Sequence, residues 1–311
     1  MPELPEVETI ARGLASRVTG DIIESVWLGE KPEPLKSAAS EIVATLEKRR
    51  IAGVRRVGKH IVFDLVRNGT PDAMASETKR KDKRSANVRI DGSRSSRARL
   101  KVPSALSRKG ASPAQSQWIV HLGMTGRMLV CRPEVQIEKH THAIVTLASG
   151  RELRFVDPRR FGRLSVSPAF IAAGLEPLDI ELQPFTGLFR GRKTPIKSAL
   201  LNQKLLSGVG NIYADESLFR AGVRPRRRAA SLTREDLKRL YVNLKEVLKE
   251  AIALGGSSVA DYVDADGEEG FFQLQHRVYG REGEPCLTCK TLIKRVVIAG
   301  RSSHYCPKCQ K

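Results

Sequence analysis

The chain has 311 residues and lacks the sequence features of a membrane or exported protein. No uninterrupted apolar run approaches the ~18 residues that a bilayer-spanning helix requires. The first ten residues, MPELPEVETI, carry three glutamates where a secretory signal would have a basic start and an apolar stretch. A basic amphipathic helix, a lipidation motif and internal repeats are absent as well. These absences predict a soluble, cytoplasmic protein that does not bind membranes.

Acidic residues are in the minority, because 34 Asp and Glu stand against 54 Lys and Arg, which gives a net charge of +20. A chain this basic is expected to bind a polyanion. Nucleic acid is the commonest such partner, since Lys and Arg gain affinity by displacing counterions from phosphates. The alternative is a basic surface that is merely solvated.

Residues 70–116 contain no aromatic residue and are rich in Ser, Ala, Arg and Lys, which predicts a disordered insertion. The segment holds twelve basic and four acidic residues, so the rest of the chain keeps a net charge of +12. The expectation of a nucleic-acid partner therefore does not depend on the insertion.

The length is typical of two domains. Apolar residues recur at helical spacing from Leu4 to Val18, which predicts a helix that begins almost at the N-terminus. A short second helix is expected over residues 41–50. Short strands are predicted at residues 22–28, 61–65, 118–122, 127–131, 142–147, 152–156 and 163–166. Strands this short and closely spaced indicate a β-sandwich or barrel as the first domain.

From about residue 190 the pattern becomes helical. Thr194 and Pro195 read as an N-cap and a first helical residue, and apolar positions follow over 196–206. A glycine-containing turn at 207–210 precedes a second helix that Asn211 can cap, so the two helices form a hairpin. Residues 233–236 have the pattern of a capping box, which predicts a further helix that runs to Gly255.

Four of the five cysteines are paired near the C-terminus, in the pattern C-x2-C-x16-C-x2-C. This spacing is typical of two turns that bring four thiolates to one tetrahedral zinc ion. Four protein ligands close the coordination sphere, so the metal is expected to be structural. Two disulfides or four free thiols are the alternative, which a reducing compartment disfavours. The predicted ligands are Cys286, Cys289, Cys306 and Cys309.

Five motifs occur in an order that resembles the bacterial formamidopyrimidine-DNA glycosylases, also called the MutM family. They are PELPEVET after Met1, LGMTG at 122–126, DPRRFG at 157–162, GVGNIY at 208–213 and the cysteine pattern. The resemblance covers nearly the whole chain except residues 70–116. It implies an α+β protein with a β-sandwich domain that carries the N-terminal helix (residues 2–180), a helix-two-turns-helix domain (181–270) and a zinc ribbon (271–311).

The resemblance also implies a bifunctional repair enzyme. Such an enzyme excises 8-oxoguanine and formamidopyrimidines through a Schiff base on Pro2, and then nicks the strand by β,δ-elimination. Removal of Met1 would expose a secondary amine on Pro2, and a helix N-terminus disfavours the charged form of that amine. The alternative for Pro2 is that it merely starts the helix.

The family resemblance assigns three further catalytic groups. Glu3 is the carboxyl that moves protons at the sugar, and Lys59 is the proton-transfer group of β-elimination. Arg301 matches the proton donor for δ-elimination, although a guanidinium holds its proton so tightly that a phosphate clamp suits it better. Glu6 either assists protonation or is a structural carboxylate.

The remaining assignments concern DNA and the damaged base. Met124, Arg159 and Phe161 match residues that fill the void left by an extruded nucleotide. Contacts to the DNA backbone are implied for His121, His140, Lys193, Lys197 and Asn211. The lesion-recognition loop corresponds to Ser257, Val259, Ala260, Asp261 and Tyr262. Two positions depart from the family pattern, where many relatives have Asp: Thr141 and Asn202.

Two rival functions remain open at this point. A noncatalytic DNA-binding protein could use the same hairpin and ribbon, and a relative of endonuclease VIII would excise oxidised pyrimidines. The expected partner is double-stranded DNA that contains oxidised bases, and no nucleotide cofactor is expected. A nucleoid-associated monomer is expected, since no heptad pattern or apolar stripe is evident.

Overall fold

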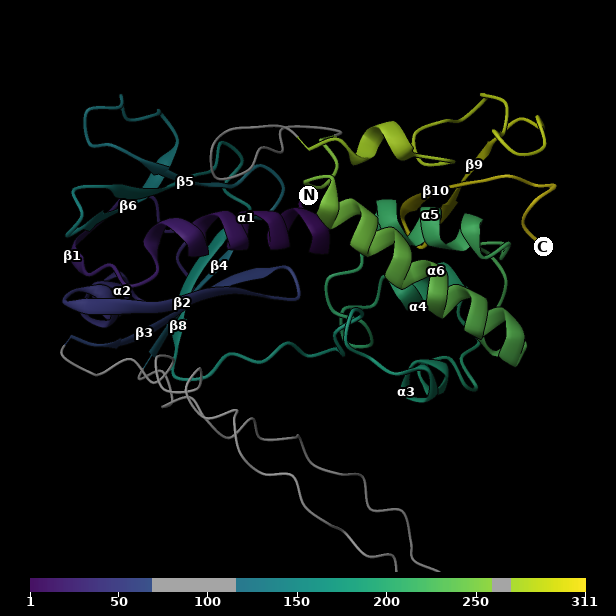
Figure 1. The fold of residues 1–311 in the computed structure, drawn as a ribbon, viewed down its shortest axis with the longest axis horizontal. Coiled ribbons are helices and arrows are strands. Elements are labelled where there is room, and N and C mark those ends of the chain that lie inside the picture. Colours follow the sequence, from purple (N-terminus) through teal and green to yellow (C-terminus); the bar gives the residue numbers. More distant parts are fainter. Residues whose placement is uncertain (69–115, 259–269) are drawn as a thin grey trace, which may run out of the picture.

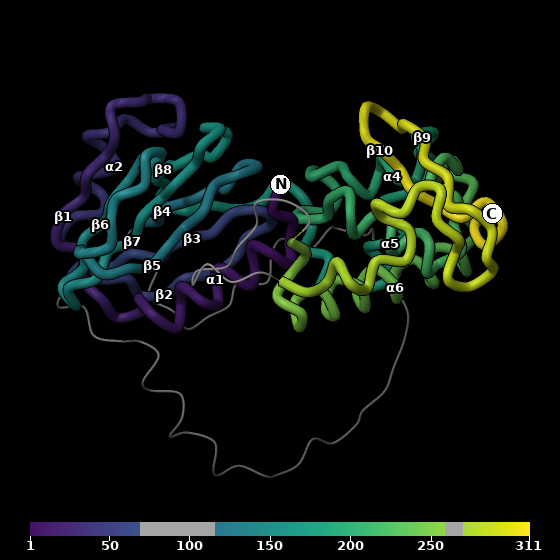
Figure 2. The backbone as a smooth tube through the Cα atoms, turned by 90° about the horizontal axis from the view of Figure 1, so that it is seen from above, coloured from purple at the N-terminus to yellow at the C-terminus, as the bar shows by residue number. Residues whose placement is uncertain are grey.

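The computed structural model describes residues 1–68, 116–258 and 270–311, which form two lobes side by side (Figures 1 and 2). The predicted insertion lies outside the described residues except for its last one. Within the described ranges, no helix combines the length and the apolar character needed to cross a bilayer.

The first lobe is a sandwich of two four-stranded antiparallel sheets, as predicted. One sheet has the order β1-β6-β7-β5, with bounds Ile23–Leu28, Thr141–Leu147, Glu152–Val156 and Arg127–Cys131. The other has the order β2-β3-β4-β8, with bounds Arg49–Val57, His60–Arg67, Ser116–His121 and Arg163–Ser167. Inward-facing residues of both sheets, among them Phe63, Trp118 and Phe155, form the core together with α1.

Strand β2 was not predicted from the sequence. The expected helix over 41–50 is shorter: α2 spans Ala39–Leu46, and the chain turns at Lys48, whose φ is 61°. From Arg49 the backbone pairs with β3 instead. Only Ile51 of β2 is fully buried, so the strand lacks the apolar alternation that reveals a strand in sequence.

The second lobe is helical and consists of α3 (Leu182–Gly187), α4 (Ile196–Leu200), α5 (Asn211–Arg220), the 3-10 turn η2 (Ala229–Ser231) and α6 (Arg234–Ala253). The predicted capping box of α6 is present, because Asp236 N–H donates to Thr233 Oγ1 (3.1 Å) and Thr233 N–H donates to Asp236 Oδ2 (3.0 Å). Helix α6 packs its apolar face on α5.

The helical hairpin differs from its prediction in its turns. Helix α4 ends at Leu200 rather than near 206, and its N-cap is Pro195, not Thr194. Gln203 Oε1 accepts from Gly208 N–H (2.9 Å), which holds the chain in turns between the helices. The N-cap of α5 is Gly210, so Asn211 is the first helical residue and its side chain is not used as a cap.

The C-terminal segment begins with the 3-10 turn η3 (Phe272–Gln275) and ends in the hairpin of β9 (Lys294–Ile298) and β10 (Arg301–Tyr305). Arg301 pairs with Ile298 at the tight turn of this hairpin. The hairpin rests on α5, because His304 N–H donates to Asp215 Oδ2 (2.9 Å).

Helix α1 (Leu4–Val18) belongs to both lobes, and Figure 1 shows its first turn at the junction between them. Leu4 is fully buried in the core of the helical lobe, whereas Val7, Ile10 and Leu14 are buried in the sandwich core. The Leu4 N–H also donates to the carbonyl of Gly208 (3.0 Å). The start of α1 is therefore fixed by the second lobe.

We expect Leu4→Ala to cost about 2–5 kcal/mol, as for other fully buried leucines. Because Leu4 couples the lobes, calorimetry is expected to show two separate unfolding transitions. Leu14→Ala is the control, since Leu14 is equally buried but only in the sandwich core. Leu14→Ala is expected to unfold in one transition. A single transition for Leu4→Ala as well would show that Leu4 does not couple the unfolding of the two lobes.

Candidate active site

A cavity of about 840 Å³ opens where the two lobes meet. It is lined by the first turn of α1, the β2–β3 turn, the turns between α4 and α5, and the β9–β10 turn. The structure thus brings together the four predicted catalytic residues, which come from three distant parts of the chain: Pro2, Glu3, Lys59 and Arg301.

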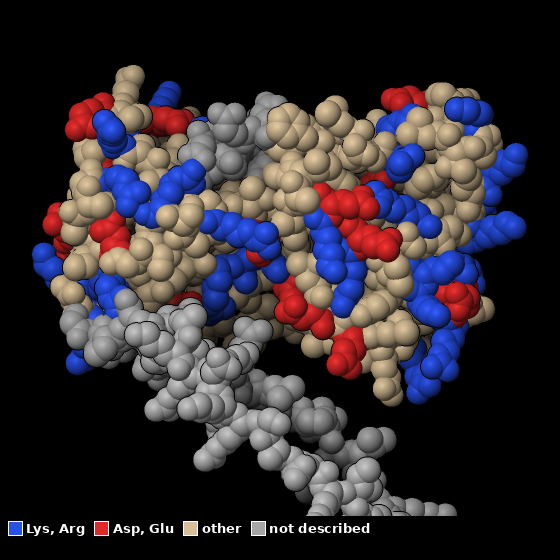
Figure 3. Space-filling model, in the orientation of Figure 1, with Lys and Arg blue, Asp and Glu red and all other residues tan. Residues whose placement is uncertain are grey.

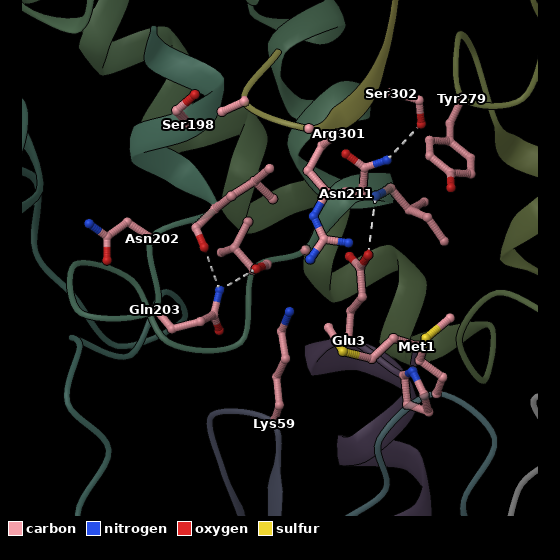
Figure 4. A pocket seen from close by; sticks show the side chains of 18 of the residues that line it. Met1, Glu3, Lys59, Ser198, Asn202, Gln203, Asn211, Tyr279, Arg301 and Ser302 are labelled. Atoms are coloured by element: carbon pink, nitrogen blue, oxygen red, sulfur yellow. Dashed lines mark hydrogen bonds between the residues drawn. The ribbon is translucent and has the colours of Figure 1, made fainter. Parts of the chain in front are cut away.

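Lys59 and Arg301 extend toward each other from opposite walls of the cavity, and Glu3 lies beside them (Figure 4). Lys59 sits in the turn between β2 and β3 and is 9% exposed. Burial lowers its pKa, and the charge of Arg301 acts in the same direction, whereas Glu3 opposes the shift. Lys59 therefore gives up its proton more easily than a solvated lysine.

Glu3 is the N-cap of α1 and is 4% exposed. Its Oε1 accepts from Ile212 N–H (3.2 Å) at the start of α5, and its Oε2 has no hydrogen-bond partner among the described residues. Burial raises the pKa of Glu3 to about 7, and Lys59 is the strongest opposing influence. Near neutral pH this carboxyl can both hold and release a proton.

Gly210 makes room for the Glu3 carboxyl group. A Cβ at position 210 would lie 2.0 Å from Glu3 Cδ, so any side chain there would displace the carboxyl or the α5 N-terminus. The close approach places the acid at the amide groups of a helix start, where negative charge is favoured.

Glu6 is buried one turn further along α1 and accepts hydrogen bonds from three groups. Its Oε1 accepts from the Tyr213 hydroxyl and from Ser257 N–H (2.8 Å), and its Oε2 accepts from Glu3 N–H (2.8 Å). Burial raises the pKa of Glu6, and these donors oppose the shift. Of the two roles left open, the contacts favour the structural one, because Glu6 ties α1 to α5 and to Ser257.

Pro2 is buried at the cavity wall, and Met1 beside it is 48% exposed. In the full sequence the Pro2 nitrogen is part of the peptide bond to Met1. A nucleophilic role for Pro2 therefore requires the removal of Met1.

The three predicted void-filling residues lie together on the surface of the first lobe. Met124 and Phe161 are 43% and 47% exposed, and the Arg159 guanidinium lies 4.9 Å from the centre of the Phe161 ring. Gly123 has φ 67°, and a Cβ there would lie 2.4 Å from the Phe161 backbone, so the two loops pack directly together.

Asp157 joins these two loops and was not singled out from the sequence. Its Oδ1 accepts from Thr125 Oγ1 (2.6 Å) and its Oδ2 from Gly162 N–H (2.7 Å), with the side chain fully buried. The sequence feature that could have indicated this role is the position of Asp157 as the first residue of the DPRRFG motif.

The predicted DNA-backbone residues have different surroundings. His140 and Lys193 are exposed, and Asn211 lies at the cavity, where its amide donates to Ser302 Oγ (3.2 Å). His121 Nδ1 accepts from Gly123 N–H (3.1 Å), and burial lowers the pKa of His121 to about 4. His121 is therefore a neutral donor rather than a cation at neutral pH.

Lys197 does not fit its predicted contact with phosphate. Its side chain is fully buried, with Nζ 2.6 Å from Asp215 Oδ1, and it donates to the carbonyl of Ser302 (2.6 Å). Lys197 therefore holds the β9–β10 hairpin, and with it Arg301, against the helical hairpin. Other basic residues remain on the surface: Figure 3 shows Lys and Arg side chains on both sides of the junction of the lobes, with Asp and Glu side chains among them.

Of the predicted lesion-recognition residues, Ser257 is described and lines the cavity, 5% exposed. The others, residues 259–262, lie outside the described residues. The two departures from the family pattern both make local hydrogen bonds. Thr141 Oγ1 donates to the Glu138 carbonyl (2.8 Å), and Asn202 Oδ1 accepts from Lys204 N–H (3.0 Å).

Tyr279 also lines the cavity and was missed in the sequence. Its backbone is fixed by the buried Glu216, which accepts from the N–H groups of Arg277 (2.9 Å), Val278 (3.0 Å) and Tyr279 (2.8 Å). Nothing in the local sequence distinguishes this tyrosine from one that is packed in a core.

Models of known protein families match most of the chain. The formamidopyrimidine-DNA glycosylase N-terminal domain matches residues 1–164 and the formamidopyrimidine-DNA glycosylase H2TH domain matches residues 173–263. The zinc finger found in FPG and IleRS matches residues 283–311. The chain belongs to the formamidopyrimidine-DNA glycosylase family.

Relatives and solved structures agree over the full length. The formamidopyrimidine-DNA glycosylase of Solibacter usitatus is 41% identical to this chain, over the full length of both proteins. That of Thermus thermophilus is 39% identical, over all of this chain and 98% of the relative. The crystal structure of MutM (Fpg) from T. thermophilus has a TM-score of 0.75 at 37% identity, covering 99% of this chain and 98% of that one. Lactococcus lactis Fpg in complex with abasic-site DNA has a TM-score of 0.78 at 28% identity, covering 99% of each chain.

The resemblance inferred from five motifs is thus confirmed. As a member of the formamidopyrimidine-DNA glycosylase family, the protein is a DNA glycosylase of oxidised-purine repair.

The cysteine cluster fits the structural zinc ion of this glycosylase family. The four Sγ atoms lie within 4.8 Å of one another, with Cys286–Cys309 at 3.9 Å and Cys289–Cys306 at 3.4 Å. Sulfurs at ~2.3 Å from a tetrahedral zinc are about 3.8 Å apart. None of the five cysteines forms a disulfide in the structure, and the spacing of the four Sγ atoms favours a shared metal over two disulfides. The buried cluster of the ribbon contains only four residues, too few to fold without metal.

Zinc removal is expected to release the hairpin that carries Arg301. Cys309→Ser should lose the one equivalent of zinc per chain and most of its DNA affinity, because the ribbon has so small a core. Elemental analysis and a DNA-binding titration measure the two effects. Cys131→Ser, which lies outside the cluster, is the control and should keep its zinc. Full zinc content in Cys309→Ser would contradict the four-cysteine site.

Glu3 is expected to destabilise the protein when it ionises. Its folded-state pKa is raised from 4.5 to about 7, so stability is lost as the pH rises between these values. Glu3→Gln avoids this loss, and its stability gain over the wild type should be about 2 kcal/mol larger at pH 8 than at pH 5. Urea unfolding at both pH values measures the difference.

Glu8→Gln provides the control for this experiment, because ion pairs with Arg12 and Arg56 lower the pKa of Glu8. It should show no such gain at pH 8. A Glu3→Gln effect that does not change with pH would contradict the raised pKa.

Proposed function

We propose that the protein is a bifunctional DNA glycosylase and abasic-site lyase that excises 8-oxoguanine and formamidopyrimidines through a Schiff base on Pro2. The observation that supports this most directly is the meeting of Pro2, Glu3, Lys59 and Arg301 in one cavity at the junction of the lobes. A noncatalytic DNA-binding protein would have no need of a buried carboxyl whose pKa is about 7.

The proposed reaction begins with attack of the Pro2 nitrogen on the sugar C1′. The bond from C1′ to the base breaks, the base leaves with a proton, and ring opening gives an iminium ion. Glu3 is placed to deliver the proton to the ring oxygen, because its carboxyl is half protonated near pH 7.

The iminium ion accepts electrons from the neighbouring sugar carbon, and this makes strand cleavage possible. Lys59, with its lowered pKa, removes a C2′ proton, and the 3′ phosphate leaves in the β-elimination. A second elimination releases the 5′ phosphate, and water then frees Pro2. We assign Arg301 to the phosphates as a bidentate clamp, since a guanidinium does not give up its proton.

DNA is proposed to lie across the junction of the lobes. The L. lactis Fpg structures contain DNA with an abasic site or a formamidopyrimidine lesion. Met124, Arg159 and Phe161 would enter the void of the extruded nucleotide, while His140 and Lys193 contact phosphates. We propose that the protein acts as a monomer on nucleoid DNA and needs no nucleotide cofactor.

Borohydride trapping tests the proposal. Wild-type protein with Met1 removed, as verified by mass spectrometry, should form a covalent adduct with a duplex that contains 8-oxoguanine opposite cytosine. Pro2→Leu should form none, because the large side chain retains Met1 and the secondary amine is lost. DNA binding by the wild type without any adduct would overturn the proposal in favour of a noncatalytic binder.

A thymine glycol duplex tests the substrate class. One L. lactis Fpg structure contains an oxidised pyrimidine, so some adduct with this duplex is compatible with the family. Faster excision of thymine glycol than of 8-oxoguanine would instead place the activity with the endonuclease VIII relatives.

A further inference from the structure

His276 does not line the cavity but lies next to Ser257, which does, and none of the roles above uses it. It follows η3, and its ring is edge-on to Phe272 (centroids 5.6 Å apart) and to Tyr279 (5.5 Å apart). Its Nε2 is 3.2 Å from the hydroxyl oxygen of Ser257, which lines the cavity.

The direction of this hydrogen bond follows from the neighbours. His276 also makes a hydrogen bond with the backbone of Tyr279, which favours the protonated ring. Tyr279 N–H already donates to Glu216 Oε1 (2.8 Å), so the group that His276 meets is the carbonyl, and the ring donates to it. Burial lowers the pKa of His276 to about 4, so the ring is neutral at neutral pH and has one protonated and one unprotonated nitrogen. With one ring nitrogen donating to the Tyr279 carbonyl, we assign the other, Nε2, as the acceptor of the Ser257 hydroxyl proton.

Ser257 connects His276 to the buried acids. Its N–H donates to Glu6 Oε1 (2.8 Å), and Glu6 Oε2 in turn accepts from Glu3 N–H (2.8 Å). Three hydrogen bonds therefore join His276 to the backbone of Glu3. Ser257 is 5% exposed, so water does not compete readily for its hydroxyl.

A second side chain of the same segment makes a parallel contact. Gln273 Oε1 accepts from Ser258 N–H (3.0 Å), and Gln273 Nε2 donates to the Gly270 carbonyl (2.6 Å). Ser257 itself pairs with Phe271 through an isolated β-bridge. Gln273 and His276, both from the segment 271–276, thus hold residues 257 and 258 through side-chain hydrogen bonds.

We propose that His276 is a positioning residue for base excision. It fixes the Ser257 hydroxyl and thereby the Ser257 N–H, which holds the Glu6 carboxyl against the backbone N–H of Glu3. The inference rests on the proposed function, because it takes Glu3, whose backbone N–H is held by Glu6, as the catalytic acid. His276 itself does not reach the cavity and is not a catalytic residue.

The test compares His276→Leu, which removes the acceptor, with His276→Gln, whose Oε1 can take the place of Nε2. We expect His276→Leu to slow single-turnover release of 8-oxoguanine about ten-fold, as for the loss of one buried hydrogen bond. The DNA dissociation constant should change less than two-fold. His276→Gln should stay within about three-fold of the wild-type rate.

A double-mutant cycle assigns the effect to Ser257. Ser257→Ala alone should slow excision to the same extent as His276→Leu, and the double variant should be no slower than either. Gln275→Leu, an exposed neighbour in η3, is the matched control and should excise at the wild-type rate. Ser257→Ala removes one oxygen atom, so it keeps the test valid if His276→Leu folds poorly.

Three results would overturn the inference: a wild-type rate in both His276→Leu and Ser257→Ala, a His276→Gln rate as low as that of His276→Leu, or multiplicative effects in the double variant. These outcomes differ from failure of the proposed function, in which the wild type itself forms no borohydride adduct.

Discussion

The burial of two carboxyl groups at the start of α1 is the constraint on which the rest of the site depends. Removing Glu3 and Glu6 from water costs free energy unless donors replace the water. Glu6 receives three such donors, from Tyr213, Ser257 and the α1 N-cap. Glu3 accepts from Ile212 N–H at the start of α5 and, in the capping box of α1, from the backbone of Glu6. Burial raises the pKa of both acids, to about 7 for Glu3, so both bind a proton more readily than solvated carboxyl groups do.

The same constraint explains why α1 crosses from one lobe to the other. The donors for Glu3 and Glu6 are on α5 and on residue 257, in the helical lobe, whereas most of the apolar face of α1 belongs to the sandwich. Leu4 is buried in the helical lobe and carries the first turn across the junction. Gly210 then allows the Glu3 carboxyl to contact the start of α5.

Periodicity and motif spacing were sufficient for the sandwich, α1, the capping box of α6 and the zinc ligands, because each is encoded within a short stretch of sequence. Strand β2 was missed, since its pairing with β3 rather than its own apolar pattern makes it a strand. The residues proposed to be catalytic were predicted only through the family resemblance, and the structure places them in one cavity. The resemblance was less informative for Lys197, for which it implied a contact with the DNA backbone. The structure instead buries this lysine in an ion pair with Asp215, which only the tertiary structure reveals.

Lys59 stands on the other side of the junction from its partners in the cavity. It is carried by the β2–β3 turn of the sandwich, whereas the start of α1 and the turn bearing Arg301 are attached to the helical lobe. The separation of Lys59 from Glu3 therefore depends on how the start of α1 is held between the two lobes. Since Lys59 is the strongest influence that holds the Glu3 pKa down, a larger separation favours the protonated acid and a smaller one favours the carboxylate.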